Sequence, residues 1–109
     1  MTEPAPPASL IVPALVRQVS AAGGFATVLN KGSPYGSALL LVHRWQADVR
    51  AYERVPGPDG RPTWRLAANG TESVDSFLAR QRRFDPDMWV IELDVANPER
   101  FVPDMPPVD

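Results

Sequence analysis

The sequence predicts an α/β (α+β) domain, a three-layer sandwich in which two main helices cover a mixed, mostly antiparallel sheet of about five strands. Two segments, residues 9–22 and 71–84, repeat apolar residues at helical spacing. Five short runs alternate or are wholly apolar, as strands are: residues 25–30, 37–45, 48–55, 63–67 and 89–94. Because several strands have two apolar faces, one helix on each face of the sheet is the simplest arrangement.

Length and composition indicate one domain with one core. The chain has 109 residues, a formal net charge of -2 and no cysteine, so disulfides and thiolate chemistry are excluded. The negative charge argues against nucleic-acid binding through a global positive field. We expect a disordered Pro-rich lead-in (residues 1–8), a globular domain (residues 9–102) and a loosely ordered tail (residues 103–109). The apolar run near the N-terminus is too short to cross a membrane, and we expect a cytoplasmic protein.

The first helix is predicted from Ile11, Leu15 and Val19, which recur on one face, and Gly23 with Gly24 supplies its end. Pro13 leaves the start open. It fits either a first turn that begins at Ser9 or a later start after an extended segment.

The sequence patterns predict different degrees of burial for the strands. Residues 25–30 and 37–45 are apolar on both faces, which predicts burial on both sides of the sheet, whereas residues 48–55 have the one-sided pattern of a strand nearer the edge. A loop rich in proline and glycine, residues 56–62, predicts a hairpin. The returning strand is expected to point Trp64 and Leu66 inward.

The second helix and the strand after it are joined by a tight turn. Thr71 can cap this helix, and its expected inner face holds Val74, Phe77, Leu78, Gln81 and Phe84. Asp85 and Pro86 then fit the first two positions of a type I turn, with the Asp85 carboxylate accepting a hydrogen bond from the Asp87 amide. In the following strand Trp89, Ile91 and Leu93 point to one face and Met88 and Val90 to the other, which predicts an inner strand.

The sequence also resembles a known family. The run at residues 80–93, RQRRFDPDMWVIEL, preceded by Lys31-Gly32 and an apolar strand at residues 38–42, resembles a bacterial family of small proteins catalogued as domain of unknown function 1491. The resemblance extends from about residue 10 to residue 101 and supports the predicted fold. That family carries no assigned activity, cofactor or catalytic residue, so the resemblance implies none here.

Charged residues around the predicted turn are the main candidates for a functional site. Arg80, Arg82 and Arg83 could form an anion patch with Trp64 or Trp45 nearby, because arginine binds phosphate with two hydrogen bonds and aromatic rings stack on bases. The same arginines also complement the dipole at a helix C-terminus and can pair with nearby carboxylates. We favour this structural interpretation because the chain is acidic.

The candidate carboxylates are Asp85, Asp87 and Glu92, which could supply an acid/base pair or oxygen ligands for a hard cation. Turn formation already explains both aspartates. Glu92, on a central strand, needs a partner, and an arginine of the preceding helix is the expected one. His43 is the sole histidine, which excludes a histidine-based metal site. We therefore expect no metal site, no cofactor and no identifiable catalytic residue.

Two functional hypotheses follow. In the first, the protein is an interaction or regulatory module that docks on a protein partner; its binding residues are Arg80, Arg82, Arg83, Asp85, Asp87, Glu92 and Trp64. In the second, it is a small enzyme or an anion- or nucleotide-binding domain that uses the three arginines, Glu92 and His43. We favour the first, with a monomer or weak homodimer and neither nucleic acid nor membrane as partner, while the sequence does not decide whether the protein is an enzyme. A closed pocket lined by those side chains would favour the second hypothesis, and a flat aromatic surface the first.

Overall fold

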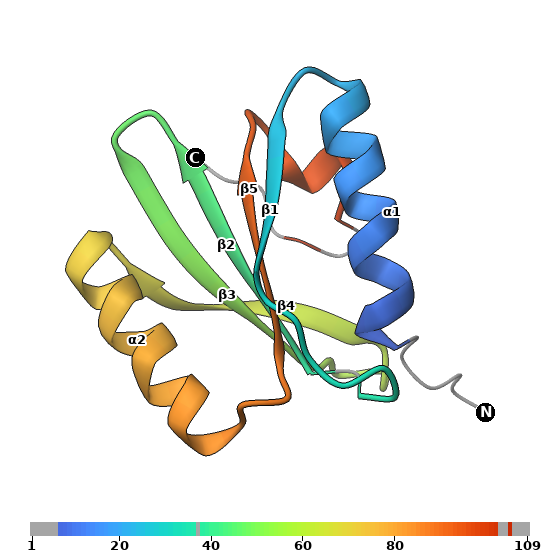
Figure 1. The fold of residues 1–109 in the computed structure, drawn as a ribbon, viewed down its shortest axis with the longest axis vertical. Coiled ribbons are helices and arrows are strands. Elements are labelled where there is room, and N and C mark those ends of the chain that lie inside the picture. Colours follow the sequence, from blue (N-terminus) through green and yellow to red (C-terminus); the bar gives the residue numbers. More distant parts are fainter. Residues whose placement is uncertain (1–6, 37, 103–104, 106–109) are drawn as a thin grey trace.

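The computed structural model describes residues 7–36, 38–102 and 105, so all of the expected lead-in except Pro7 and Ala8 and all of the expected tail except Met105 lie outside the described residues. The elements follow in the order α1 (Ala8–Ala21), β1 (Phe25–Asn30), β2 (Leu39–Trp45), β3 (Asp48–Pro56), β4 (Pro62–Asn69), α2 (Thr71–Phe84), β5 (Trp89–Asp94) and the short 3-10 helix η1 (Pro98–Arg100). The predicted class, two main helices with a five-stranded mixed sheet, is confirmed (Figure 1). Within the described part of the chain, no helix has the length and apolar character to cross a bilayer.

The strand order is β1-β5-β2-β3-β4, so the last strand of the sequence lies between the first two. β5 runs parallel to β2, with Leu41 opposite Ile91, and the other three neighbouring pairs are antiparallel. The long segment from β3 through α2 supplies the crossover that a parallel pair requires. The prediction that residues 89–94 form an inner strand is therefore confirmed.

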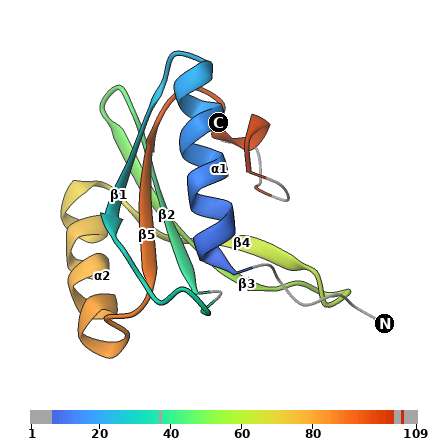
Figure 2. The same cartoon turned by 45° about the vertical axis from the view of Figure 1, so that its right-hand side comes forward.

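The sheet separates two apolar clusters, because side chains alternate along each strand. Leu39 and Leu41 pack into the cluster that contains the buried face of α1, whereas Leu40 and Val42 pack into the cluster that contains Val74 of α2. The two helices consequently lie on opposite sides of the sheet (Figures 1 and 2). The predicted three-layer arrangement is confirmed.

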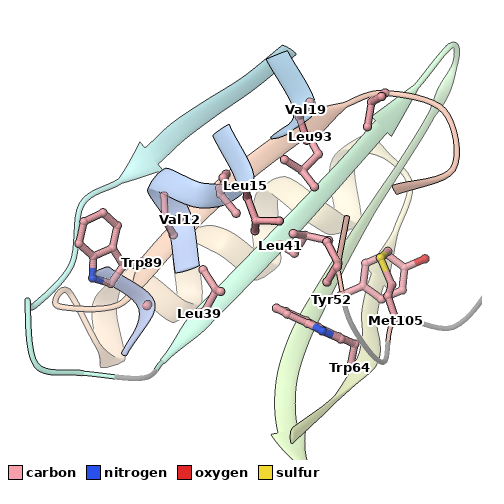
Figure 3. Close-up of a cluster of buried hydrophobic side chains, with 14 residues drawn as sticks. Val12, Leu15, Val19, Leu39, Leu41, Tyr52, Trp64, Trp89, Leu93 and Met105 are labelled. Atoms are coloured by element: carbon pink, nitrogen blue, oxygen red, sulfur yellow. The ribbon is translucent and has the colours of Figure 1, made fainter. Parts of the chain in front are cut away.

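The cluster under α1 is the larger one and extends along the whole face. Trp89 lies at one end of it, and Tyr52, Trp64 and Met105 gather at the other (Figure 3). Residues that follow β5 complete the cluster: Val102 and Met105 are 2% and 7% exposed. This face therefore combines residues from both ends of the described chain.

Four burial predictions were wrong. β3, expected to be buried on one face, sends Tyr52 into the cluster under α1 and Val49 into the cluster under α2. β1 is an edge strand and not an inner strand of the sheet, and its Phe25 side chain is 73% exposed. Leu66, predicted to point inward, is 49% exposed, and Phe84, predicted on the inner face of the second helix, is 86% exposed. Phe84 is the last residue of α2, next to the turn, so its position is set by where the helix ends and not by the periodicity of the helix.

Both helix starts differ from the predictions. α1 begins at Ala8 after an extended Pro7, so Pro13 lies inside the helix, where its side chain is exposed; it neither occupies the first turn nor marks the start. In α2 the N-cap position is held by Gly70, with φ 98°, and no side chain caps the helix. Thr71 is the first helical residue, so the predicted Thr71 cap was wrong.

Candidate functional site

Five of the predicted site residues, the three arginines with Asp85 and Asp87, lie where α2 turns into β5. We call residues 80–88, together with the loop at residues 30–36, the α2–β5 corner. Asp85 forms the turn as the sequence predicted: the Asp87 amide donates to Asp85 Oδ1 over 3.2 Å, and the Met88 amide donates to the Asp85 carbonyl over 3.3 Å. The Asp85 amide donates in turn to the Gln81 carbonyl of the helix, over 2.8 Å. The helix end and the turn thus form one hydrogen-bonded unit.

The loop after β1 holds this turn in place. The Asn30 side-chain amide donates to the carbonyls of Pro86 and Met88, over 3.2 and 2.5 Å. The Ser33 amide donates to the Asp87 carbonyl over 2.7 Å, and the Trp89 indole N–H donates to the Ser33 carbonyl over 2.8 Å. Because these bonds link segments more than 50 residues apart, the corner is fixed by tertiary contacts as well as by its own turn.

Gly32 allows this close approach. A Cβ atom at this position would lie 2.2 Å from the Asp87 carbonyl oxygen and 2.7 Å from Trp89 Cδ1. Both distances are far below van der Waals contact, so only glycine lets the loop lie against the turn.

The three arginines are exposed around the corner. Arg82 Nη2 donates to the Leu29 carbonyl of β1 over 3.3 Å, which connects the end of α2 to the edge strand. Among the described residues the ion pairs are Arg44–Glu92, Arg61–Asp59 and Arg65–Glu53, so none of the three corner arginines is paired with a carboxylate. Of the two structural roles expected for them, dipole complementation is possible and carboxylate pairing is not seen.

Two aromatic rings of the corner face solvent. Phe84, between Arg83 and the turn, is 86% exposed, and Tyr35 in the loop is 91% exposed. The corner therefore displays aromatic rings and arginines on a hydrogen-bonded backbone. Tyrosine, phenylalanine and arginine are the residue types enriched where proteins contact one another.

Glu92 lies apart from the corner arginines. Its Oε1 is 2.6 Å from Nε of Arg44 on β2, so the expected partner from the preceding helix was wrong. This hydrogen bond from the arginine to Glu92 raises the pKa of Arg44 above its ordinary value. Since both side chains are partly exposed, at 44% and 21%, the pair contributes little to stability.

His43 and Trp64 lie on the other side of the sheet from Glu92. His43 is 4% exposed, and its Nε2 lies 2.8 Å from the Val95 carbonyl. A carbonyl oxygen can only accept a hydrogen bond, so the His43 Nε2–H group is the donor to the Val95 carbonyl. Trp64 packs in the cluster under α1. The structure thus does not bring either residue to the corner, and the sheet separates His43 from Glu92.

Hollows lined by described residues have room for a small molecule. Arg80 lines one of about 470 Å³ with residues of β4 and the start of α2, and Trp45 lines one of about 280 Å³ beside Phe25. Trp64 lines an apolar groove of about 500 Å³ between α1, the β3–β4 hairpin and the segment after β5, where burial lowers the pKa of Arg54. Within residues 7–36, 38–102 and 105, no three histidine or acidic side chains gather as metal ligands would.

Sequence reasoning missed three residues of the corner. Phe84 was placed inside by helical periodicity, and Tyr35 and Asn30 carried no pattern of their own. The available signal was local: an aromatic residue directly before Asp-Pro cannot continue the apolar stripe once the helix stops. The Asn30 contacts involve residues 56 and 58 positions away and have no local signal.

Comparison with known proteins places the chain in a family. A family model described as protein of unknown function (DUF1491) matches residues 7–103. The chain belongs to this family. The α2–β5 corner lies within the matched region, and the family description gives no activity for it.

Solved structures of similar proteins share the fold. A protein from A. tumefaciens, solved in solution, is 30% identical over 94% of this chain and 98% of its own, with a TM-score of 0.75. Two structures of a DUF1491 family protein from Caulobacter crescentus CB15 also match. The crystal structure is 27% identical over 90% of this chain and 96% of that one (TM-score 0.75), and the NMR structure is 25% identical over 95% and 99% (TM-score 0.79). A comparison with curated protein sequences found no match.

Proposed function

We propose that this protein is a small cytoplasmic interaction or regulatory module of a bacterial cell that docks on a protein partner through the α2–β5 corner. The observation that carries this proposal is Phe84, an aromatic side chain 86% exposed on a backbone that hydrogen bonds hold rigid. Exposing such a ring to water costs free energy that a partner recovers by covering it, and a rigid backbone loses little entropy on binding.

The charges around Phe84 indicate the kind of partner surface. Arg80, Arg82 and Arg83 are exposed on the last turns of α2, and Lys31 is exposed in the adjoining loop. Asp85 and Asp87 lie among them, so the corner is not a uniform cation trap of the kind that binds phosphate chains. An apolar pocket with an acidic rim fits this surface better than a nucleic acid does.

The alternative enzyme hypothesis has less support. It requires Glu92, His43 and an arginine of α2 to converge, but the sheet separates the first two, and each has a partner elsewhere, Arg44 and the Val95 carbonyl. A general acid or base must reach the reacting atom directly or through one water molecule. The convergence that this hypothesis needs is absent among the described residues.

The experiment is affinity capture from an extract of the source cells, followed by binding measurements between the recovered protein and purified variants. Phe84→Ser and the double variant Arg82→Gln/Arg83→Gln should each weaken binding about tenfold or more, as expected for contacts that carry binding energy. Leu66→Ser and Arg17→Gln are matched controls, since they change an exposed leucine and an exposed arginine away from the corner.

The Phe84, Leu66 and Arg17 variants should keep the parent's urea unfolding curve, because exposed side chains contribute little to folding. The double arginine variant also loses the hydrogen bond from Arg82 to the Leu29 carbonyl, so its unfolding midpoint is measured and binding is compared where both proteins are folded. Unchanged binding by both corner variants would reject this docking surface. Saturable binding of an oligonucleotide at physiological salt, lost in the arginine variant, would replace the protein partner with a nucleic acid.

A further inference from the structure

The two edges of the sheet are protected to different degrees. β4 begins with Pro62 and carries Arg65, which pairs with Glu53 of β3. Proline and charged residues are the usual devices that stop an edge strand from pairing with another chain. β1, at the other edge, has the sequence FATVLN, with no charge and no proline. Among the described residues β1 is therefore the less protected edge, and the hydrogen bond that it accepts from Arg82 lies near its C-terminal end, at the Leu29 carbonyl.

The side chains of β1 are also incompletely covered. Phe25 is 73% and Val28 is 41% exposed, and Thr27 between them is exposed as well. Ala26 packs toward the cluster under α1, and Leu29 packs toward the cluster under α2. Each face of the strand thus has one apolar residue that is sheltered and one that is exposed.

We infer that β1 pairs with β1 of a second copy of this chain, antiparallel and centred on Thr27. In this register Phe25 lies beside Leu29 of the partner, Ala26 lies beside Val28, and Thr27 lies beside Thr27. Every cross-strand pair joins residues on the same face, and each exposed apolar side chain gains an apolar neighbour. The two sheets then join into one, with the same patch used by both copies, as a two-fold axis requires.

Charge supports the same pairing. Asp94 lies opposite Phe25 on β5, and Arg44 lies opposite Asp94 on β2, one strand further from the edge, so the nearest charged side chain of the sheet at this end of β1 is a carboxylate. Arg82, which donates to the Leu29 carbonyl, and Lys31, which follows β1, make the other end basic. A two-fold axis at Thr27 brings the Asp94 end of each copy to the basic end of the other.

The association should be weak, because six residues of edge form an interface below the usual size for stable complexes. Sedimentation equilibrium of the full chain should show the mass rising from one chain toward two between about 10 μM and 1 mM. Amide signals of residues 25–29 should shift over the same concentration range. A mass that stays at one chain up to about 1 mM overturns the inference.

Substitutions at Thr27 give the sharper test, because the side chain is exposed and would meet its own copy at the axis. Thr27→Lys or Thr27→Glu alone should remain monomeric through repulsion, and an equimolar mixture of the two should dimerise again. Leu66→Lys on the β4 edge is the matched control and should dimerise like the parent. A dimer that survives in both Thr27 variants overturns the pairing.

This test is separate from that of the docking surface, because Thr27 lies outside the α2–β5 corner. If the parent chain is monomeric at every concentration and Thr27→Lys no longer captures the partner protein, the β1 edge pairs with a strand of another protein. That result would overturn self-pairing. Loss of the dimer with partner capture intact supports self-pairing.

Discussion

Gly32 lies where the loop after β1 passes over the turn before β5, and it offers a local test of the corner. Gly32→Ala would bring a Cβ atom to 2.2 Å from the Asp87 carbonyl oxygen. We expect the loop to be displaced and the free energy of unfolding to fall by about 1–3 kcal/mol, as for other overpacked sites. Gly36→Ala in the same loop is the control, because its nearest neighbour is Ser33 Cβ at 3.8 Å. Equal urea midpoints for the two variants would show that the loop does not lie against the turn.

Asp85 is the second residue on which the corner depends. Asp85→Ala removes the acceptor for the Asp87 amide, and we expect a loss of about 0.5–2 kcal/mol, by analogy with capping side chains. Asp87→Ala is the matched control, since the Asp87 side chain is exposed and the backbone amide at position 87 still donates to the Asp85 carboxylate. Chemical denaturation of both variants measures the difference. If Asp87→Ala is as destabilising as Asp85→Ala, the turn is not held by the Asp85 carboxylate.

At the residue scale, the sequence predicted contacts between near neighbours and not those between distant ones. The bond from the Asp87 amide to Asp85 was predictable because a proline at the second turn position defines the geometry locally. The Glu92 partner was not, because Arg44 reaches it only through the parallel pairing of β2 and β5, which places Val42 opposite Glu92. No spacing in the sequence specifies which strand will lie beside β5.

Among the elements, β5 is an inner strand that pairs on both sides and contributes side chains to both clusters. Trp89→Ala at its start should lower the free energy of unfolding by about 3–5 kcal/mol, the cost of truncating a buried aromatic residue. Trp89 is 7% exposed and also donates to the Ser33 carbonyl. Trp45→Ala is the control, because Trp45 is 41% exposed at the end of β2. Thermal or urea unfolding of Trp89→Ala close to the parent would contradict its role as an anchor.

Strand positions were predictable where apolar runs were bounded by turn residues, but strand neighbours were not. Residues 25–30 matched β1 at both ends, yet the same run was expected to be covered on both faces. A short apolar strand has the same pattern at an edge as in the centre of a sheet. Within the described part of the chain, β1 pairs with β5 alone, which comes from the far end of the sequence, so local patterns could not show that β1 is an edge strand.

For the molecule as a whole, the arrangement in three layers follows from the number of apolar faces that the strands present. Strands with two apolar faces require cover on both sides, and two helices supply it. This argument needs no strand order, which explains why the three layers were predictable and the position of β5 between β1 and β2 was not. The corner combines both kinds of information: its turn is local, and the loop that holds it is distant.

The two clusters on opposite faces should unfold together, because β2 and β5 send alternate side chains into both. Val74→Ala leaves a cavity under α2 and should lower the free energy of unfolding by at least about 1.5 kcal/mol, from two buried methyl groups and the space they vacate. Leu15→Ala, on the buried face of α1, should lower the free energy of unfolding by about 2–5 kcal/mol.

Fluorescence separates the two faces, because Trp64 and Trp89 both lie in the cluster under α1. Val74 lies on the other side, so its truncation can change the tryptophan-detected transition only through the shared strands. We expect Val74→Ala to shift the fluorescence and far-ultraviolet circular dichroism midpoints by the same amount in urea. A circular dichroism transition that moves while the fluorescence transition stays in place would show that α2 and its face of the sheet unfold separately.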